Sequence, residues 1–331
     1  SLQPLVALVG NPVAGNPAQY LFEKAFEHHS LDWRFITFQV DSDQLETAIQ
    51  GIRALGIQAG IFSPPMDVHA ARLLDTLDTH AENTVATDCW QRSDDGRRLE
   101  GHYIGGQTVV SLLSAHHPIE GSHCVILGTE TLARAIAAEL ATLKATEIQF
   151  VVEDNDIAQC DHLVQTLSEI FPAVKWNRLQ RFGEYQPEEQ PSANSVRNAQ
   201  LQAHSGQNAG AGDIGPQQGI DLQTPPDAFL IPPETAFLVN TLIDDGETPI
   251  DVSELGIMID LSQVQKSTIV ADIALYPVAT ELIREAAEHG CTIISGLDIL
   301  IEQSARQFEL WIGFTPDRSI MRDAVEEYLE L

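Results

Sequence analysis

Short apolar runs alternate with amphipathic segments along the N-terminal third of the chain, and this alternation predicts its secondary structure. An apolar run over residues 5–9 ends at Gly10 and precedes a helical pattern over 18–29. Further predicted elements are a strand over 33–40, a helix over 43–55, a strand over 58–62 and a helix over 68–77. Repeated strand–helix–strand units predict a parallel β-sheet covered by helices.

The same rhythm restarts after a polar hairpin-like turn at Asp94-Asp95-Gly96 and a break at Gly105-Gly106 that marks a domain boundary. A strand over 124–127, a helix over 131–143 and a strand over 148–152 form a unit of the mononucleotide-binding type. The pattern predicts further elements at 156–171, 236–242, 256–261, 269–273, 279–289, 292–294, 298–311 and 319–329. Residues 180–228 are rich in Gln, Asn, Gly, Ser and Pro, which predicts a flexible polar insertion.

The charge balance excludes two classes of partner. The 331 residues include 18 Lys and Arg against 48 Asp and Glu, a net charge of −30. Such a polyanion repels nucleic acid and anionic membranes, and no apolar run is long enough to span a bilayer. Four widely spaced cysteines suggest neither a zinc site nor a disulfide framework, and adjacent histidines at 28–29 and 116–117 point to different faces of their elements. We therefore expect a soluble, cytoplasmic protein without a metal site.

A candidate phosphate-binding loop lies where the strand over 124–127 passes into a helix. A G-x-G-x-x-G/A loop at such a place cradles a pyrophosphate, and the sequence here is Gly128-Thr129-Glu130-Thr131-Leu132-Ala133. The candidate cofactor contacts are Gly128, Thr129, Thr131 and Ala133. The Glu130 carboxylate would repel a phosphate about 4 Å away by on the order of 4 kcal/mol at an effective dielectric of about 20. We therefore expect weak or absent nucleotide binding.

Glu153 is a further candidate cofactor contact. It follows the next strand, 20 positions after Ala133, where an acid can accept a hydrogen bond from a ribose 2′-hydroxyl. If a dinucleotide binds, this acid favours NAD over NADP. In the alternative interpretation, Glu153, Asp154 and Asp156 form only a solvated turn and helix cap.

Motifs at both ends of the chain resemble those of one known family. They are Gly10-Asn11-Pro12-Val13, Arg53-Ala54-Leu55-Gly56-Ile57, Asp272-Ile273-Ala274-Leu275-Tyr276-Pro277, Gly296-Leu297-Asp298-Ile299-Leu300 and Phe308-Glu309-Leu310-Trp311-Ile312-Gly313. Together they resemble the shikimate dehydrogenases. The resemblance implies a two-domain α/β fold. A substrate-binding-type α/β domain would span 1–106 plus the C-terminal helix 315–331, and a Rossmann-like domain with a doubly wound parallel sheet would span 107–314.

The resemblance also implies NADP-dependent interconversion of 3-dehydroshikimate and shikimate, with the small-molecule ligand in a cleft between the domains. In the family, two serines hold the substrate carboxylate and a lysine serves in proton transfer. The corresponding residues here are Asn16, Ala18 and Asp67. A carboxylate cannot stabilise a developing alkoxide as an ammonium group does, because its charge has the wrong sign.

The aspartate that pairs with that lysine in the family is also replaced. The family's G-x-N-T-D segment corresponds to residues 101–105, so Tyr103 stands at the asparagine and Gly105 at the aspartate. The family's upstream N-T pair falls at Asp88-Cys89. Gln303 alone keeps both position and chemistry among the substrate contacts, so the candidate substrate-binding residues are Asn16, Asp88 and Gln303.

Three functions stay open at this point. The first interpretation is a binding or pseudoenzyme module that has lost the family's catalytic residues. The second is an active NAD(P)-dependent oxidoreductase on a shikimate-like or other polar hydroxy acid, with Asp67, Asp88, His102 or Tyr103 as the acid–base group. Tyr103 is attractive here because a phenol can donate a proton to a ketone. The third, suggested by the missing initial Met, is the dehydrogenase half of a bifunctional dehydroquinate dehydratase and shikimate dehydrogenase. Both a monomer and a homodimer fit the sequence.

Overall fold

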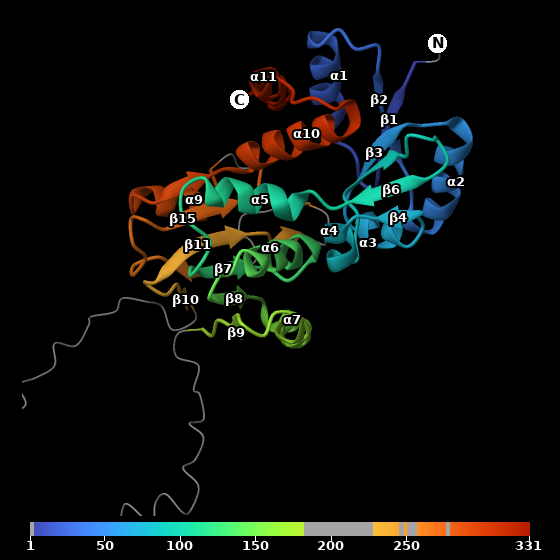
Figure 1. Cartoon of the computed structure of the whole chain (residues 1–331). Helices are drawn as coiled ribbons and strands as arrows, with labels where there is room; N and C mark the ends of the chain where they lie inside the picture. The colour runs from blue at the N-terminus through green and yellow to red at the C-terminus, as the bar shows by residue number, and fades with distance from the viewer. Residues whose placement is uncertain (1–2, 182–227, 245–247, 250–256, 276–278) are drawn as a thin grey trace, which may run out of the picture.

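The chain forms two α/β domains, each built on its own six-stranded sheet (Figure 1). The computed structural model describes residues 3–181, 228–244, 248–249, 257–275 and 279–331. The predicted two-domain α/β fold is confirmed. Most of the insertion predicted over 180–228 lies outside the described residues.

The first sheet is mixed and has the strand order β2-β1-β3-β5-β6-β4. Its strands are β1 (Leu5–Gly10), β2 (Arg34–Gln39), β3 (Ala59–Phe62), β4 (Thr76–Leu77), β5 (Cys89–Arg92) and β6 (Leu99–His102). β2, β1 and β3 are parallel, as the strand–helix–strand pattern predicts, whereas β5 and β6 form the antiparallel hairpin expected around Asp94-Asp95-Gly96. The helices of this domain are η1 (Ser42–Gln44), α1 (Ala18–His28), α2 (Leu45–Leu55), α3 (Met66–Ala71) and α4 (Thr79–Thr84).

The second sheet is wholly parallel and has the order β16-β15-β11-β7-β8-β9, the doubly wound order of a dinucleotide-binding fold. Its strands are β7 (His123–Leu127), β8 (Glu147–Val151), β9 (Lys175–Arg178), β11 (Thr235–Asn240), β15 (Ile269–Asp272) and β16 (Thr292–Ile294). Two short pairs join β10 (Phe229–Leu230) to β14 (Ile259–Asp260) and β12 (Ile243–Asp244) to β13 (Thr248–Pro249). Its helices are α5 (Gly105–Ser114), α6 (Thr131–Thr142), η2 (Asp154–Asp156), α7 (Ile157–Ile170) and α9 (Glu281–Glu288).

Two predicted details are wrong. The segment over 68–77 is not one helix, because Asp75 donates its N–H to the Leu99 carbonyl and the chain there joins the sheet as β4. The Gly105-Gly106 pair is not a break but the start of α5. A Cβ at Gly106 would lie 2.8 Å from the Cβ of Ala135, so glycine allows α5 to approach α6 closely.

The last two helices, α10 (Gly296–Ile312) and α11 (Arg318–Leu329), return to the first domain (Figure 1). The ring centroids of Phe22 and Trp311 lie 5.0 Å apart, and those of Phe26 and Phe308 lie 5.8 Å apart. α10 therefore begins beside the second sheet, just after β16, and ends in the aromatic core of the first domain. Among the described residues, no helix combines the length and apolarity needed to cross a membrane.

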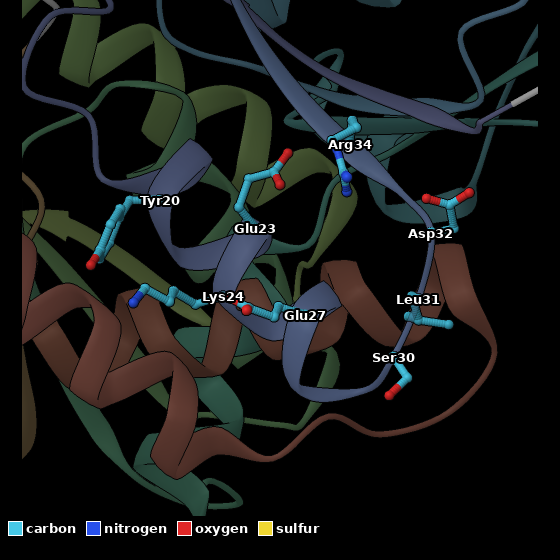
Figure 2. Close-up of a pocket in the computed structure, with 8 residues that line it drawn as sticks. All are labelled: Tyr20, Glu23, Lys24, Glu27, Ser30, Leu31, Asp32 and Arg34. Carbon is cyan, nitrogen blue, oxygen red and sulfur yellow. The ribbon is translucent and has the colours of Figure 1, made fainter.

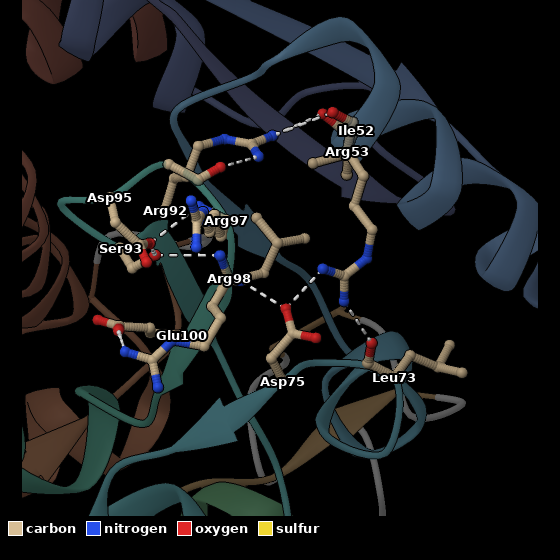
Figure 3. A network of polar contacts seen from close by, with 12 residues as sticks. Ile52, Arg53, Leu73, Asp75, Arg92, Ser93, Asp95, Arg97, Arg98 and Glu100 are labelled. Atoms are coloured by element: carbon tan, nitrogen blue, oxygen red, sulfur yellow. Dashed lines mark hydrogen bonds and ion pairs between the residues drawn. The ribbon is translucent and has the colours of Figure 1, made fainter.

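Arg92, on β5, caps the carboxyl end of α2 (Figure 3). Its guanidinium donates to the carbonyl oxygens of Ile52, Arg53, Gly96 and Ile57, at 3.0, 3.4, 3.0 and 3.2 Å. The last carbonyls of a helix have no partner within the helix, so an arginine satisfies both their hydrogen bonding and the negative end of the helix dipole. The contact ties α2 to the β5–β6 hairpin.

We expect Arg92→Met to lower the free energy of unfolding by about 2 kcal/mol, because it leaves several partly buried carbonyl groups without their donor. Urea denaturation measures the change. The matched control is Arg97→Met, which removes an exposed arginine of the same hairpin and should change stability by less than about 0.5 kcal/mol. Equal losses in the two variants would contradict the capping role.

Candidate functional site

Several candidate residues of the first domain share one edge of its sheet. β3 ends at this edge, and because β5 is antiparallel to β3 and β6 antiparallel to β5, β5 begins and β6 ends there too. The register pairs Ile61 with Cys89 and Cys89 with His102. The residues that adjoin these strand ends are Ser63, Asp67, Asp88 and Tyr103.

Asp88 lies directly before β5, and its side chain is buried. Oδ1 accepts the N–H of Ile104 at 2.9 Å and Oδ2 accepts the N–H of Gly105 at 2.7 Å. These amides stand at the start of α5, where the helix dipole favours a carboxylate. Gln303 of α10 donates to Oδ2 at 3.4 Å. One carboxyl group thus contacts both helices that connect the two domains.

Gly105, the position at which the resemblance implies an acid, lies beside this carboxyl group. A Cβ built on Gly105 would be 3.2 Å from Asp88 Oδ2. The Asp88 carboxyl group therefore lies within contact distance of residue 105, the position at which the resemblance implies an acid.

Asp67 is the second buried carboxyl group of the site. It lies at the start of α3 and is 2% exposed. Burial raises its pKa to about 6, against the lowering effect of the Val68 N–H, which donates to Oδ1 at 2.9 Å, and of the Arg134 charge. The N–H of Thr87 donates to the Asp67 carbonyl at 3.0 Å, which holds this residue next to Asp88.

Asp88 itself titrates near neutral pH. Burial raises the pKa of its carboxyl group to about 7, although the two amide hydrogen bonds lower it, and the negative charge of Asp67 raises it further. The site therefore contains two neighbouring carboxyl groups that change protonation close to physiological pH. Such perturbed groups cluster at functional sites.

Tyr103 and Arg134 complete the charged surroundings. Burial, together with the charges of Asp88 and Asp67, raises the pKa of Tyr103 well above its usual value, so its side chain stays a neutral phenol. Arg134 belongs to α6 of the second domain, and its Nη2 donates to the carbonyl of Thr84 at the end of α4. Its positive charge acts on both Asp67 and Tyr103.

Asn16 and Ala18 hydrogen-bond to each other and not, within the described residues, to Asp67 or Asp88. The Oδ1 of the exposed Asn16 accepts the N–H of Ala18 at 2.9 Å, at the start of α1, and Ala18 is buried. The structure thus brings together Asp67, Asp88, Tyr103 and Gln303 of the predicted residues. In the described part of the chain, the Asn16 side chain hydrogen-bonds to the start of α1 and not to this group.

The predicted phosphate loop lies at the carboxyl end of β7. Gly128 has a φ of +102°, and a Cβ there would lie 2.9 Å from Thr241 Oγ1, so both conformation and space require glycine. Thr129 and Ala133 are buried, and Thr131 begins α6. Glu130 is the N-cap of α6 but makes no side-chain cap hydrogen bond, and its carboxylate accepts from Gln159 Nε2 at 3.1 Å. That bond draws the Glu130 charge toward α7.

Glu153 stands just after β8, the strand beside β7, where the ribose of a bound dinucleotide is expected. It is the N-cap of η2 without a side-chain cap hydrogen bond. The neighbouring Asp154 pairs with Arg181 at 3.4 Å. Within the described residues, no group of three His, Cys, Asp or Glu side chains is placed to hold a metal ion.

Two features of the site were missed from the sequence. One is Arg134, whose contact with Thr84 depends on the packing of α6 against α4. The other is the lack of hydrogen-bond partners for three buried polar atoms, Ser63 Oγ, His102 Nε2 and Arg134 Nε, among the described residues. His102 itself is one of the acid–base candidates predicted from the sequence, but its burial without a partner at Nε2 depends on tertiary packing.

A separate surface groove of about 610 Å³ lies along α1 and the loop into β2 (Figure 2). Two of its charged groups already have partners: Glu23 accepts the N–H of Phe35 at 2.6 Å, and Lys24 Nζ lies 5.1 Å from the centroid of the Tyr20 ring and 3.6 Å from Glu327 Oε2. None of the predicted site residues lines it. The groove is therefore separate from the candidate site at the edge of the first sheet.

Two family profiles match the chain. The Shikimate dehydrogenase substrate binding domain matches residues 8–89, which include Asp67 and Asp88. The Shikimate 5′-dehydrogenase C-terminal domain matches residues 296–326, which include Gln303. Both matched regions contribute residues to the site described above.

Similar proteins span nearly the whole chain. A shikimate dehydrogenase (NADP(+)) of Bacillus cereus is 26% identical over 330 residues, which cover 99% of each chain. That of Methanopyrus kandleri is 27% identical over 327 residues, covering 98% of this chain and 96% of the relative. Among solved structures, a 5-ketofructose reductase of Gluconobacter has a TM-score of 0.74 at 23% identity and 98% and 99% coverage. A Listeria monocytogenes shikimate 5-dehydrogenase, in complex with shikimate and NAD, has a TM-score of 0.72 at 20% identity and 98% and 96% coverage.

We expect Asp67→Asn to stabilise the protein above pH 7 and to leave its stability unchanged near pH 3. The pKa of the Asp67 carboxyl group is near 3.8 in the unfolded state and about 6 in the folded state. As pH rises through this range, the unfolded state loses the Asp67 proton before the folded state does, so wild-type stability falls. The shift corresponds to at most about 3 kcal/mol, and the loss persists at higher pH. Urea denaturation between pH 3 and pH 8 measures it.

The control for this titration is Asp94→Asn, which neutralises an exposed carboxylate in the β5–β6 turn. It should follow wild type within about 0.5 kcal/mol across the range. If the gain in the free energy of unfolding of Asp67→Asn over wild type does not vary with pH, packing and not the buried charge causes the gain.

Proposed function

The chain belongs to the shikimate dehydrogenase family, and from this premise we propose that it is a nicotinamide-dependent oxidoreductase that interconverts a ketone and a secondary alcohol. The observation that carries the proposal is the buried Asp88 carboxyl group beside Gly105. It supplies an acid where the family's own acid is missing. A structural neighbour named as a 5-ketofructose reductase supports ketone reduction on this fold.

The loop at Gly128 fits a bound dinucleotide, because glycine allows the close backbone approach and α6 begins without a side-chain cap. The nicotinamide, when bound, supplies or accepts the hydride at the substrate carbon. Residues Gly128, Thr129, Thr131 and Ala133 would hold the phosphates, and Glu153 the ribose. We propose NAD as the preferred nucleotide because Glu153 repels the 2′-phosphate of NADP, and weak binding overall because of Glu130.

Asp88 exchanges the proton in this proposal. In the direction of reduction, its protonated carboxyl group donates a proton to the substrate oxygen while the substrate carbon gains the hydride, and Asp88 becomes a carboxylate. Oxidation returns the proton. A pKa of about 7 keeps both forms populated near neutral pH, and the amides of Ile104 and Gly105 stabilise the carboxylate.

Asp67 acts on Asp88 through its charge, which favours the protonated form of Asp88. Tyr103 is less suited to proton exchange, because its raised pKa makes the phenol a poor acid at neutral pH. We assign Tyr103 and Gln303 to substrate positioning, since both lie next to the carboxyl group that reacts.

A non-catalytic binding module is the second candidate function. Its specific support is the pair of replacements Asp67 and Gly105 at the family's lysine and aspartate, together with a phosphate loop that keeps one glycine. In that case the site binds a small molecule without turning it over. We retain the cytoplasm as the proposed location because all four cysteines are free thiols.

We expect the wild-type protein to oxidise NADH with a ketone substrate in a panel that contains 5-ketofructose, and to turn over 3-dehydroshikimate, shikimate and quinate at background rate. Asp88→Asn should lower kcat by about 10²–10⁴-fold, because it removes the group that exchanges the proton. Absorbance at 340 nm measures the rate.

The double variant Asp88→Asn with Gly105→Asp provides the matched rescue, because it restores the family's asparagine and aspartate at these two positions. Its kcat should be at least about tenfold higher than that of Asp88→Asn. Wild-type kcat in Asp88→Asn would disprove the role of Asp88. Nucleotide and ligand binding without turnover of any ketone would favour the binding module.

Cofactor binding gives a separate prediction. We expect wild type to bind NAD⁺ more tightly than NADP⁺, with both dissociation constants above the micromolar range. Glu130→Gly with Thr131→Gly should strengthen NAD⁺ binding by about tenfold or more, because it removes a charge beside the phosphates. Calorimetric titration measures it, and Glu130→Gln separates charge from bulk. Micromolar binding by wild type, or a folded double variant that binds neither nucleotide, would contradict this account.

A further inference from the structure

Substrate charge is the property that the site restricts most, and we infer that the substrate is an uncharged polyhydroxylated ketone or its alcohol, not a carboxylate. The inference rests on the proposed function for the place where the ligand binds. Three features of the site restrict substrate charge: the two buried acids, the number of acids that face Arg134, and the buried polar atoms without partners among the described residues.

Negative charge already fills the site. Asp67 and Asp88 are 2% and 8% exposed, and the N–H of Thr87, the residue before Asp88, donates a hydrogen bond to the carbonyl of Asp67. A substrate carboxylate about 5 Å from an ionised Asp67 would lose on the order of 100-fold in affinity at an effective dielectric of about 20. A hydroxyl group has no such penalty and can donate a hydrogen bond to either carboxyl oxygen.

The charge of Arg134 faces more than one acid. Its Nη2 donates to the carbonyl of Thr84, its charge interacts with Asp67 and Glu130, and its buried Nε has no hydrogen-bond partner among the described residues. The four lysines lie elsewhere: Lys24, Lys144 and Lys175 pair with Glu327, Glu120 and Glu147, and Lys266 lies beside Gly290. One arginine charge therefore stands against the carboxylates of Asp67 and Glu130 in the described part of the chain, so an added substrate carboxylate would leave these groups with an excess of negative charge.

Polar atoms without partners at the same sheet edge suit hydroxyl groups. Ser63 Oγ and His102 Nε2 are buried there without a hydrogen-bond partner among the described residues, and the burial of such an atom is unfavourable until a partner is supplied. Asp88 and Gln303 add an acceptor and an amide. At position 18 a buried methyl group replaces a hydroxyl that would hold a substrate carboxylate. Donors and acceptors of this kind match several hydroxyl groups better than one anion.

The test compares ligands that differ in one charge. Shikimate and its methyl ester have the same ring and hydroxyl groups, and D-fructose serves as a neutral ketose. Calorimetric titration at pH 8, with and without NAD⁺, gives their dissociation constants without any need for turnover. We expect methyl shikimate to bind at least about 10-fold more tightly than shikimate.

Variants assign the discrimination to the buried acid. Asp67→Asn should strengthen shikimate binding by about 10-fold and change methyl shikimate binding by less than about twofold, whereas Asp94→Asn should change neither. Equal binding of shikimate and its ester by wild type, an unchanged ratio in Asp67→Asn, or failure of every neutral ligand to bind would overturn the inference. Because binding is measured, an inactive protein that prefers neutral ligands would refute the proposed reaction and leave this inference standing.

Discussion

The Asp88 carboxyl group accepts the N–H groups of Ile104 and Gly105, and this one interaction positions both the helix that enters the second domain and the acid of the site. α5 begins at Gly105, packs along α6 through Gly106, and receives α10 on another face. A carboxylate at the start of a helix is stabilised by the uncompensated amides and by the dipole. The domain junction and the group proposed to exchange the proton therefore depend on the same two hydrogen bonds.

This arrangement explains why Asp88 and Asp67 can both be buried. Placing two acids in a site of low polarity is costly, and proteins reduce the cost by hydrogen bonding and by raising the pKa so that one acid stays protonated. Asp88 has two amide donors, and Asp67 has the Val68 amide and the positive charge of Arg134. The pair consequently retains a proton close to neutral pH, which is the condition that acid–base exchange requires.

The sequence predicted the architecture well because strand and helix periodicity is local. The two sheets, the parallel order of the second and the hairpin around Asp94 all follow from short segments and turn residues. β4 was mistaken for helix because its two residues join the sheet only through contacts with β6. The site was harder to predict. Aligning motifs placed Asp88 and Gly105 at separate family positions, but their contact depends on the register that pairs Cys89 with His102.

The kind of residue that replaced the family's catalytic groups favours a rebuilt site over a decayed one. A site that drifts without function gains nothing from a buried ion, so substitutions toward apolar residues, which avoid the cost of desolvation, would be favoured for stability. Here the lysine position holds a buried aspartate, and a second buried aspartate stands beside the vacated acid position. The same changes remove a cation and two hydroxyl donors that suit an anionic ligand. The proposed change of substrate from an acid to a neutral polyol accounts for the carboxylate at residue 67 and for the loss of the serine hydroxyl at Ala18, because both changes lower the affinity for a carboxylate.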